Sequence, residues 1–310
     1  GAISGRTVVS MTHGPSVSWS PVSGPTETGN GMDTAQVDDP LFRKAMSLYH
    51  GTDGRVDRRE AYRLFEESGS PRSIVMIAIM KDSGEGTARD KATAELLIST
   101  VRDSLDSILG DDPESEWIRS QLFMAGLGCE KSYEDVVKHL LPVALKGYAP
   151  AQHSLGCMYD FGEGVPQSYD EAIKWYRKAA DQGFSDAQNN IGYMYECGRG
   201  VPQSYDEAIR WYRKAADQGY VKAQMELSSM YELGRGVPQS DEEAAKWCRK
   251  AADQGYAIAQ RYLGVMYNNG IGVPQSYEEA AKWYRKAADQ GYAIAQFNLG
   301  SMYYDGKGVP

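Results

Sequence analysis

Apolar residues in the second half of the chain recur at helical spacing in two alternating segments. Residues 151–161 carry one apolar arc when successive residues are turned by about 100°, formed by Ala151, Leu155, Met158 and Tyr159. Residues 169–180 carry an arc of small and aromatic side chains, formed by Ala172, Trp175, Tyr176, Ala179 and Ala180. The pattern predicts two amphipathic helices, which we call helix A and helix B.

Polar residues, glycine and proline mark the ends of these helices. Gly162 and Gly164 end helix A, and Pro166 prevents its continuation. Ser168 and Glu171 form an S-x-x-E capping signal at the start of helix B. Because the turns between the two helices are short, we expect an antiparallel pair.

The helix pair is repeated with a period of 36 residues. The sequence of residues 151–186 recurs with few changes at 187–222, 223–258 and 259–294, and residues 295–310 begin a further copy. Such a period indicates a stacked array in which each unit buries its apolar arcs against its neighbours. We therefore expect an all-α solenoid, with four regular repeats and a terminal half repeat in 151–310. Gly156 should let the helices approach closely, while Trp175 and Tyr176 fill the space between units.

A weaker form of the same pattern covers residues 37–150, where we expect about three degenerate helix pairs that cap the stack. Asp57 with Glu60 is a D-x-x-E signal for the start of a helix. Thr87 with Asp90 is expected to begin a long helical stretch. Pro113 fits the first turn of a further helix.

Residues 1–36 are rich in Gly, Ser, Thr and Pro and lack apolar periodicity, which predicts a flexible segment. Residue 1 is Gly rather than Met, and the last repeat is incomplete. We therefore expect the chain to be a fragment of a longer protein.

The recurring text reads A-x-x-x-L-G-x-M-Y-x-x-G-x-G-V-P-x-x-[YD]-x-E-A-x-x-W-x-x-K-A-A-x-Q-G. This pattern resembles the Sel-one-like repeat, a relative of the tetratricopeptide repeat. The resemblance runs residue by residue over 151–310 and more loosely over 38–150. It implies a right-handed superhelix whose A helices line the concave side.

Family members act as adaptors and scaffolds of protein complexes, so the resemblance implies a non-catalytic scaffold that binds a partner protein or peptide on the concave surface. Two alternatives remain open. One is a regulatory repeat module of a larger enzyme, such as a kinase-linked or degradation-complex adaptor. The other is a secreted ligand-binding repeat protein.

The charge and hydropathy of the chain disfavour nucleic acid and membranes as partners. A net charge of −9 disfavours binding along a nucleic-acid backbone, and no run of 18 apolar residues is present that could insert into a membrane. The basic residues of helix B, Lys174 and Arg177, have Asp170 and Asp181 four residues away, which predicts ion pairs on a solvated face. We therefore expect protein partners and neither nucleic acid nor membrane.

Cysteine and histidine residues give little sign of catalysis or of metal and cofactor binding. The four cysteines, Cys129, Cys157, Cys197 and Cys248, do not recur at one repeat position, unlike the disulfides of a secreted branch of the family. This favours reduced thiols and a cytoplasmic location. The histidines are too scattered for a regular metal site: His13, His50, His139 and His153. We interpret His153 as a surface residue of helix A and expect no enzymatic activity.

The copies differ from one another mainly in helix A, at the third, fourth, seventh, tenth and eleventh positions of the unit. These positions are expected to face away from the apolar arc, so the variation predicts a binding surface that differs from unit to unit; relaxed drift of exposed positions is the alternative. The candidate partner-binding residues are His153, Asn189, Asn190, Tyr193, Glu226, Arg261, Tyr262, Asn268, Phe297 and Asn298. Self-association through the open C-terminal edge, with Leu299, Met302 and Tyr303, is a further hypothesis.

Overall fold

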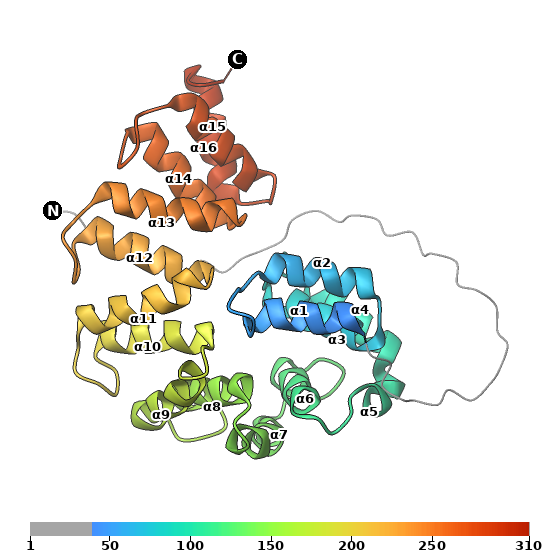
Figure 1. The fold of residues 1–310 in the computed structure, drawn as a ribbon. Helices are drawn as coiled ribbons and strands as arrows, with labels where there is room; N and C mark the ends of the chain where they lie inside the picture. The colour runs from blue at the N-terminus through green and yellow to red at the C-terminus, as the bar shows by residue number, and fades with distance from the viewer. Residues whose placement is uncertain (1–38, 310) are drawn as a thin grey trace, which may run out of the picture. The chain divides into compact units, whose positions relative to one another are not determined.

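The computed structural model of the protein describes residues 39–309, which form α-helices joined by turns (Figure 1). The predicted flexible segment 1–36, together with His13, lies outside the described residues. Within residues 39–309 no helix is both long enough and apolar enough to cross a membrane.

The helices form successive pairs. In the N-terminal part these are α1 (Pro40–His50) with α2 (Arg58–Ser68), α3 (Pro71–Ser83) with α4 (Lys91–Val101), and α6 (Pro113–Ala125) with α7 (Tyr133–Leu145). A short 3₁₀ turn (Arg102–Ser104) and α5 (Leu105–Ile108) connect α4 to α6. The regular part consists of α8 (Ala149–Phe161), α9 (Tyr169–Ala180), α10 (Ser185–Cys197), α11 (Tyr205–Asp217), α12 (Val221–Leu233), α13 (Asp241–Asp253), α14 (Ala257–Asn269), α15 (Tyr277–Ala288) and α16 (Ala293–Asp305).

From α1 to α4 and from α6 to α16, each helix packs against its neighbours in the chain, as expected for a solenoid, and α6 packs against α3 where the short α5 intervenes (Figure 1). The even-numbered helices from α8 to α16 are the A helices, and the odd-numbered helices from α9 to α15 are the B helices. The predicted apolar arcs are confirmed, because Ala151, Leu155 and Met158 of α8 and Tyr176 of α9 are almost completely buried. The buried side chains of each pair join those of the next, so the core is a seam along the array.

The predicted turn and cap chemistry accounts for the helix ends. Gly162 ends α8 in the left-handed region at φ 71°, where glycine has no steric penalty. The Ser168 hydroxyl accepts a hydrogen bond from the Glu171 backbone N–H at 3.3 Å and so caps α9. Asp57 caps α2 in the same way through the N–H of Glu60 at 3.0 Å.

Two details of the sequence interpretation are wrong. The helix after residue 84 begins at Lys91 rather than near Thr87, because Asp90 is the residue whose side chain caps it, accepting from the Thr93 N–H at 3.1 Å. On helix B, Lys174 pairs with Glu171 at 2.7 Å rather than with Asp170, since the carboxylate at i−3 is the one that reaches it.

Candidate functional site

The candidate partner-binding residues lie on five successive A helices and differ in exposure. Three aromatic side chains are exposed to solvent: Tyr193 on α10 at 37%, Tyr262 on α14 at 40% and Phe297 on α16 at 75%. The remaining candidates are half-buried, namely His153, Asn189, Asn190, Glu226, Arg261, Asn268 and Asn298. The exposed part of the candidate surface is therefore aromatic and lies in the regular repeats.

Arginine side chains accompany two of the exposed rings. The Arg261 guanidinium carbon lies 3.8 Å from the centroid of the neighbouring Tyr262 ring, and that of Arg199 lies 5.1 Å from the Tyr193 ring. Stacking of this kind holds each ring in place and leaves the guanidinium edge available to an acceptor. The buried Nε of Arg261 has no hydrogen-bond partner among residues 39–309.

The expectation that His153 is a surface residue is wrong. Its ring packs 5.3 Å from Phe184 and 5.6 Å from Tyr176, measured between centroids. Its Nε2 lies 3.1 Å from Asn190 Nδ2 and 3.5 Å from Cys157 Sγ. The structure thus brings His153 and Asn190 together, but they face other residues of the same chain.

These residues are covered because the N-terminal repeats meet the central ones. A cavity of about 160 Å³ lies where the two parts converge. Side chains from α1, α2, α6, α8 and the start of α10 contribute to its wall, among them His50, Arg58, Trp117, His153, Cys157, Phe184 and Asp186. The first variable positions of the array, His153 and Cys157 among them, therefore border a partly enclosed cavity, whereas Tyr193, Tyr262 and Phe297 are open to solvent.

An ionic cluster centred on Arg58 holds the two parts together. The Arg58 guanidinium donates to both carboxylate oxygens of Asp186, at 2.8 and 2.7 Å, and to Glu85 at 3.1 Å. It also lies over the rings of Tyr49 and Tyr220, at 4.9 and 5.5 Å from their centroids. The hydroxyl of Tyr220 donates to Asp186 Oδ1 at 2.9 Å, so this oxygen accepts hydrogen bonds from both Tyr220 and Arg58.

A backbone contact lies beside this cluster. The N–H of Val56, in the α1–α2 connection, donates to the carbonyl of Gln218, between α11 and α12, at 2.8 Å. The connection is therefore held to the central repeats by both backbone and side-chain bonds.

Burial and charge shift the pKa values of the groups in this region. Burial alone would raise the pKa of Asp186, but the Arg58 guanidinium, followed by His153, outweighs it and holds that pKa below its ordinary value. Burial, with Arg58 adding to it, lowers the pKa of His50 to about 3. His50 is therefore a neutral imidazole at physiological pH.

The sequence interpretation did not identify the Arg58 cluster. One signal was available, because the last position of the 36-residue unit is Asp186 in the first copy and then Lys222, Ile258 and Ile294. This position stands just inside the start of the next A helix and was not among the variable positions considered. Its partner Arg58 is 128 residues away in the sequence, and no local pattern connects the two.

The basic residues of helix B are engaged within the array. Lys178, Lys214, Lys250 and Lys286 each lie over the tryptophan three residues earlier, at 3.7 to 4.0 Å from the ring centroid. Arg177 and its copies Arg213, Arg249 and Arg285 donate to the tyrosine hydroxyl of the next A helix. The constancy of helix B thus has a structural cause, and the contrast with helix A does not by itself indicate binding.

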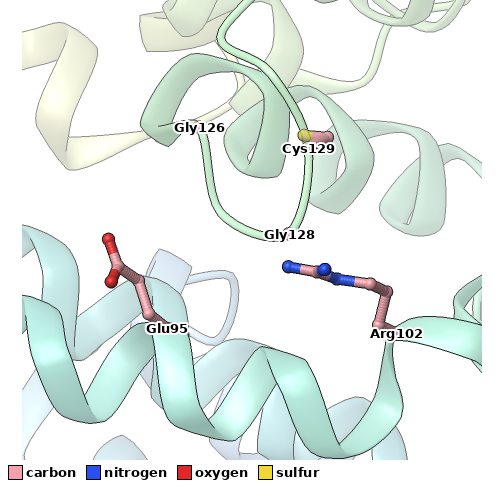
Figure 2. A pocket seen from close by; sticks show the side chains of 5 residues that line it. All are labelled: Glu95, Arg102, Gly126, Gly128 and Cys129. Carbon is pink, nitrogen blue, oxygen red and sulfur yellow. The ribbon is translucent and has the colours of Figure 1, made fainter.

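A second hollow, of about 400 Å³, lies between α4 and the α6–α7 connection (Figure 2). Glu95 and Arg102 extend from the α4 side, and Gly126, Gly128 and Cys129 belong to the loop opposite them (Figure 2). Burial, with Asp135 adding to it, raises the pKa of the Cys129 thiol, which disfavours a nucleophile there. No group of three or more metal-ligating side chains is assembled within residues 39–309.

Comparison with known proteins identifies the repeat. The family model described as Sel1 repeat matches residues 42–70, 149–184, 185–220, 221–256, 257–292 and 293–310. The comparison with curated proteins returned no match.

Two solved structures resemble the chain in sequence and fold. One is a protective antigen present in uropathogenic Escherichia coli strains that displays an SLR fold, with 34% identity, a TM-score of 0.58 and coverage of 80% of this chain. This chain spans 52% of that antigen. The other is a Sel1 repeat protein from Oxalobacter formigenes, with 32% identity, a TM-score of 0.57 and coverage of 84% of this chain and 75% of that one.

Proposed function

The chain belongs to the Sel1 repeat family, and we propose that it is a scaffold that binds a partner peptide through the exposed aromatic side chains of its A helices. Proteins built from Sel1 repeats are in general protein-interaction modules. The observation that carries the proposal for this chain is the exposure of Tyr193, Tyr262 and Phe297 on α10, α14 and α16.

Exposed aromatic rings on a repeat array favour protein contacts. Tyrosine and arginine are enriched among the residues that carry binding energy at interfaces, because their rigid or planar groups bury much area with little loss of conformational entropy. Tyr262 stacked on Arg261 supplies both an apolar face and a cationic edge. A partner segment with an apolar side chain beside a carboxylate is complementary to this pair.

Hydrogen-bonding side chains lie on two of the helices that carry these rings. Asn298 on α16 and Asn268 near the end of α14 are half-buried and can bond to an extended backbone through both a donor and an acceptor. His153 and Asn190, in contrast, bond to each other within the chain. We therefore propose that the partner contacts the repeats from Tyr193 to Phe297.

The experiment is selection from a phage-displayed library of random peptides, followed by titration of one enriched peptide. Replacing Tyr193, Tyr262 and Phe297 together by Ala should weaken its binding at least tenfold, or about 1.4 kcal/mol. The matched control replaces Lys174, Arg210 and Lys246 on the B helices, whose side chains are more than 60% exposed and pair only with their own helix. Equal affinity of the aromatic variant and the wild type would contradict the proposal.

The cysteines support a proposal on location. All four are free, and no two of them are paired across the repeats. We propose that the protein occupies a reducing compartment such as the cytoplasm, because unpaired thiols persist there. Titration of free thiols in protein isolated without reductant tests this, and fewer than four would contradict it.

A further inference from the structure

The cavity at the meeting point of the N-terminal and central repeats contains a thiol next to an imidazole. Cys157 and His153 stand four residues apart on α8, so both side chains leave the same face of the helix and border the cavity. His153 Nε2 lies 3.5 Å from Cys157 Sγ, within hydrogen-bond distance for sulfur. The cavity volume of about 160 Å³ is enough for several molecules of the size of water, which each take about 30 Å³.

Two further polar groups converge on the same sulfur atom. The hydroxyl of Tyr176 lies 3.4 Å from Cys157 Sγ and 3.3 Å from Asp160 Oδ2 and can donate to either, and Asn190 Nδ2 lies 3.7 Å from the sulfur. Donors directed at sulfur stabilise the thiolate over the thiol, since the charged acceptor makes the stronger hydrogen bonds. The nearby imidazole can accept the thiol proton, as in other Cys–His pairs.

An independent observation indicates that the cavity takes a small polar molecule. His50 forms part of its wall and is only 4% exposed, yet neither of its ring nitrogens has a hydrogen-bond partner among residues 39–309. A buried imidazole without a partner is costly. A small molecule that can both donate and accept a hydrogen bond would remove that cost.

The electrostatic surroundings agree with proton transfer to His153. Burial lowers the pKa of His153, but the Cys157 sulfur and the Asp186 carboxylate outweigh it and leave the pKa above its ordinary value. The other cysteines lack this arrangement: burial raises the pKa of Cys248 to about 12, and Cys129 is also shifted upward. Cys197 is exposed at the end of α10.

We propose that Cys157 is an activated thiol that is oxidised by small peroxides within this cavity. His153 takes the proton from sulfur, and the thiolate attacks one peroxide oxygen. A sulfur–oxygen bond forms while the oxygen–oxygen bond breaks, and the leaving hydroxide takes the proton from His153 to become water. Sulfur is oxidised by two electrons to a sulfenic acid, and the peroxide is reduced by two electrons.

The test compares two cysteines of the same chain. Reduced full-length protein is treated with hydrogen peroxide in the presence of dimedone, and labelling of Cys157 and Cys197 is followed by mass spectrometry. At pH 7, Cys157 should be labelled about tenfold faster than the more exposed Cys197, because His153 lies within reach of the thiol proton and can act as its base. Labelling of Cys157 no faster than that of Cys197 overturns the proposal.

Two further measurements separate activation from simple access. His153→Gln and Tyr176→Phe should each slow labelling of Cys157 several-fold at pH 7 and leave Cys197 unchanged. The Cys197→Ser variant should leave the Cys157 rate unaltered. Unchanged labelling of Cys157 in both His153→Gln and Tyr176→Phe overturns the proposal.

Discussion

Gly156 lies so close to the ring of Tyr176 that a Cβ atom built on it would stand 2.4 Å from Cδ1 of that ring. The same relationship joins Gly192 to Tyr212 and Gly264 to Tyr284. The third repeat has Ser228 and Cys248 at these two positions. There the smaller partner leaves room for a side chain, and the Ser228 hydroxyl donates to the carbonyl of Ala244 at 2.8 Å. Within each repeat, the side chain at this position of helix A and the facing side chain of helix B are thus complementary in size.

The first prediction follows from the glycines. Gly192→Ala should destabilise its repeat by about 1–2 kcal/mol, because overpacking against Tyr212 outweighs the better helix propensity of Ala. Gly300→Ala is the control, since a Cβ atom there meets no heavy atom within 4 Å, and it should be neutral or stabilising. Hydrogen exchange of the amides in α10–α11 and in α16 measures both. Equal effects of the two substitutions would show that the contact with Tyr212 is unimportant.

The second prediction concerns Ser228 and Cys248, which stand in the third repeat where the other repeats have Gly and Tyr. Cys248→Tyr alone should destabilise α12–α13 by roughly 1–3 kcal/mol, since the new ring meets the Ser228 side chain. Adding Ser228→Gly should recover most of this loss and give a coupling energy of at least about 1 kcal/mol in a double-mutant cycle. Urea unfolding of the four proteins provides the values, and strict additivity would contradict size matching.

The third prediction concerns Arg58. Its side chain is 13% exposed and that of Asp186 is 10% exposed, so Arg58→Ala leaves a buried carboxylate without its partner. The cost should be about 3–5 kcal/mol, seen as faster hydrogen exchange in the α1–α2 connection and at the start of α12. The exposed pair of Arg63 and Glu60 provides the control, and Arg63→Ala should leave exchange at both segments unchanged. Unaltered exchange in Arg58→Ala would mean that other contacts hold the two parts together.

The fourth prediction is a loss of stability in acid caused by His50. Its pKa is about 3 in the folded protein, whereas an unfolded chain has a histidine pKa of about 6.5. The unfolded state therefore binds the proton more readily below pH 6.5, and the contribution of neutral His50 is lost as the pH falls from there toward 3.

Relative to His50→Phe, the free energy of unfolding of the wild type should fall by up to about 1.4 kcal/mol per pH unit over this range. The neighbouring ionisable groups are the same in both proteins: Arg58, Asp186 and His153. Their contributions to the pH dependence of the unfolding free energy therefore largely cancel in the comparison. Parallel pH profiles of the two proteins would contradict a buried, unprotonated His50.

The fifth prediction concerns self-association. The expectation that Leu299 and Met302 are exposed at the C-terminal edge is wrong, because Met302 is buried and Leu299 is half-buried, and only Tyr303 of the three is exposed. Other apolar side chains of α16 are open to solvent: Ile294 is 44% exposed and Tyr304 is 93% exposed, on the helix that carries Phe297. If this apolar face joins two chains, sedimentation velocity should detect a dimer at micromolar concentration, and Ile294→Lys with Tyr304→Lys should abolish it. Wild-type protein that remains monomeric at high concentration would exclude self-association through α16.

By itself, the sequence determined the helices, their caps and their pairing, including the small residue Gly156 at a close approach of two helices; that the Tyr176 ring is the group packed on Gly156 was learned from the structure. These features depend on groups within one 36-residue unit, where hydrogen bonds and apolar spacing act over one or two helical turns. The sequence also indicated the exposed rings of Tyr193, Tyr262 and Phe297, because a residue off the apolar arc of a repeated helix is generally solvent-exposed.

Only the tertiary structure decided that Arg58 reaches Asp186 and that His153 borders a cavity instead of solvent. The contact between Arg58 and Asp186 depends on small rotations between successive repeats, which accumulate from α2 to α10. Packing between the repeats determines these rotations, and no local sequence pattern encodes them. The degenerate N-terminal repeats differ in length, and these lengths determine which residues of the N-terminal helices contact the central repeats. The environment of Cys157, His50 and His153 results from this meeting and could not be derived from the unit alone.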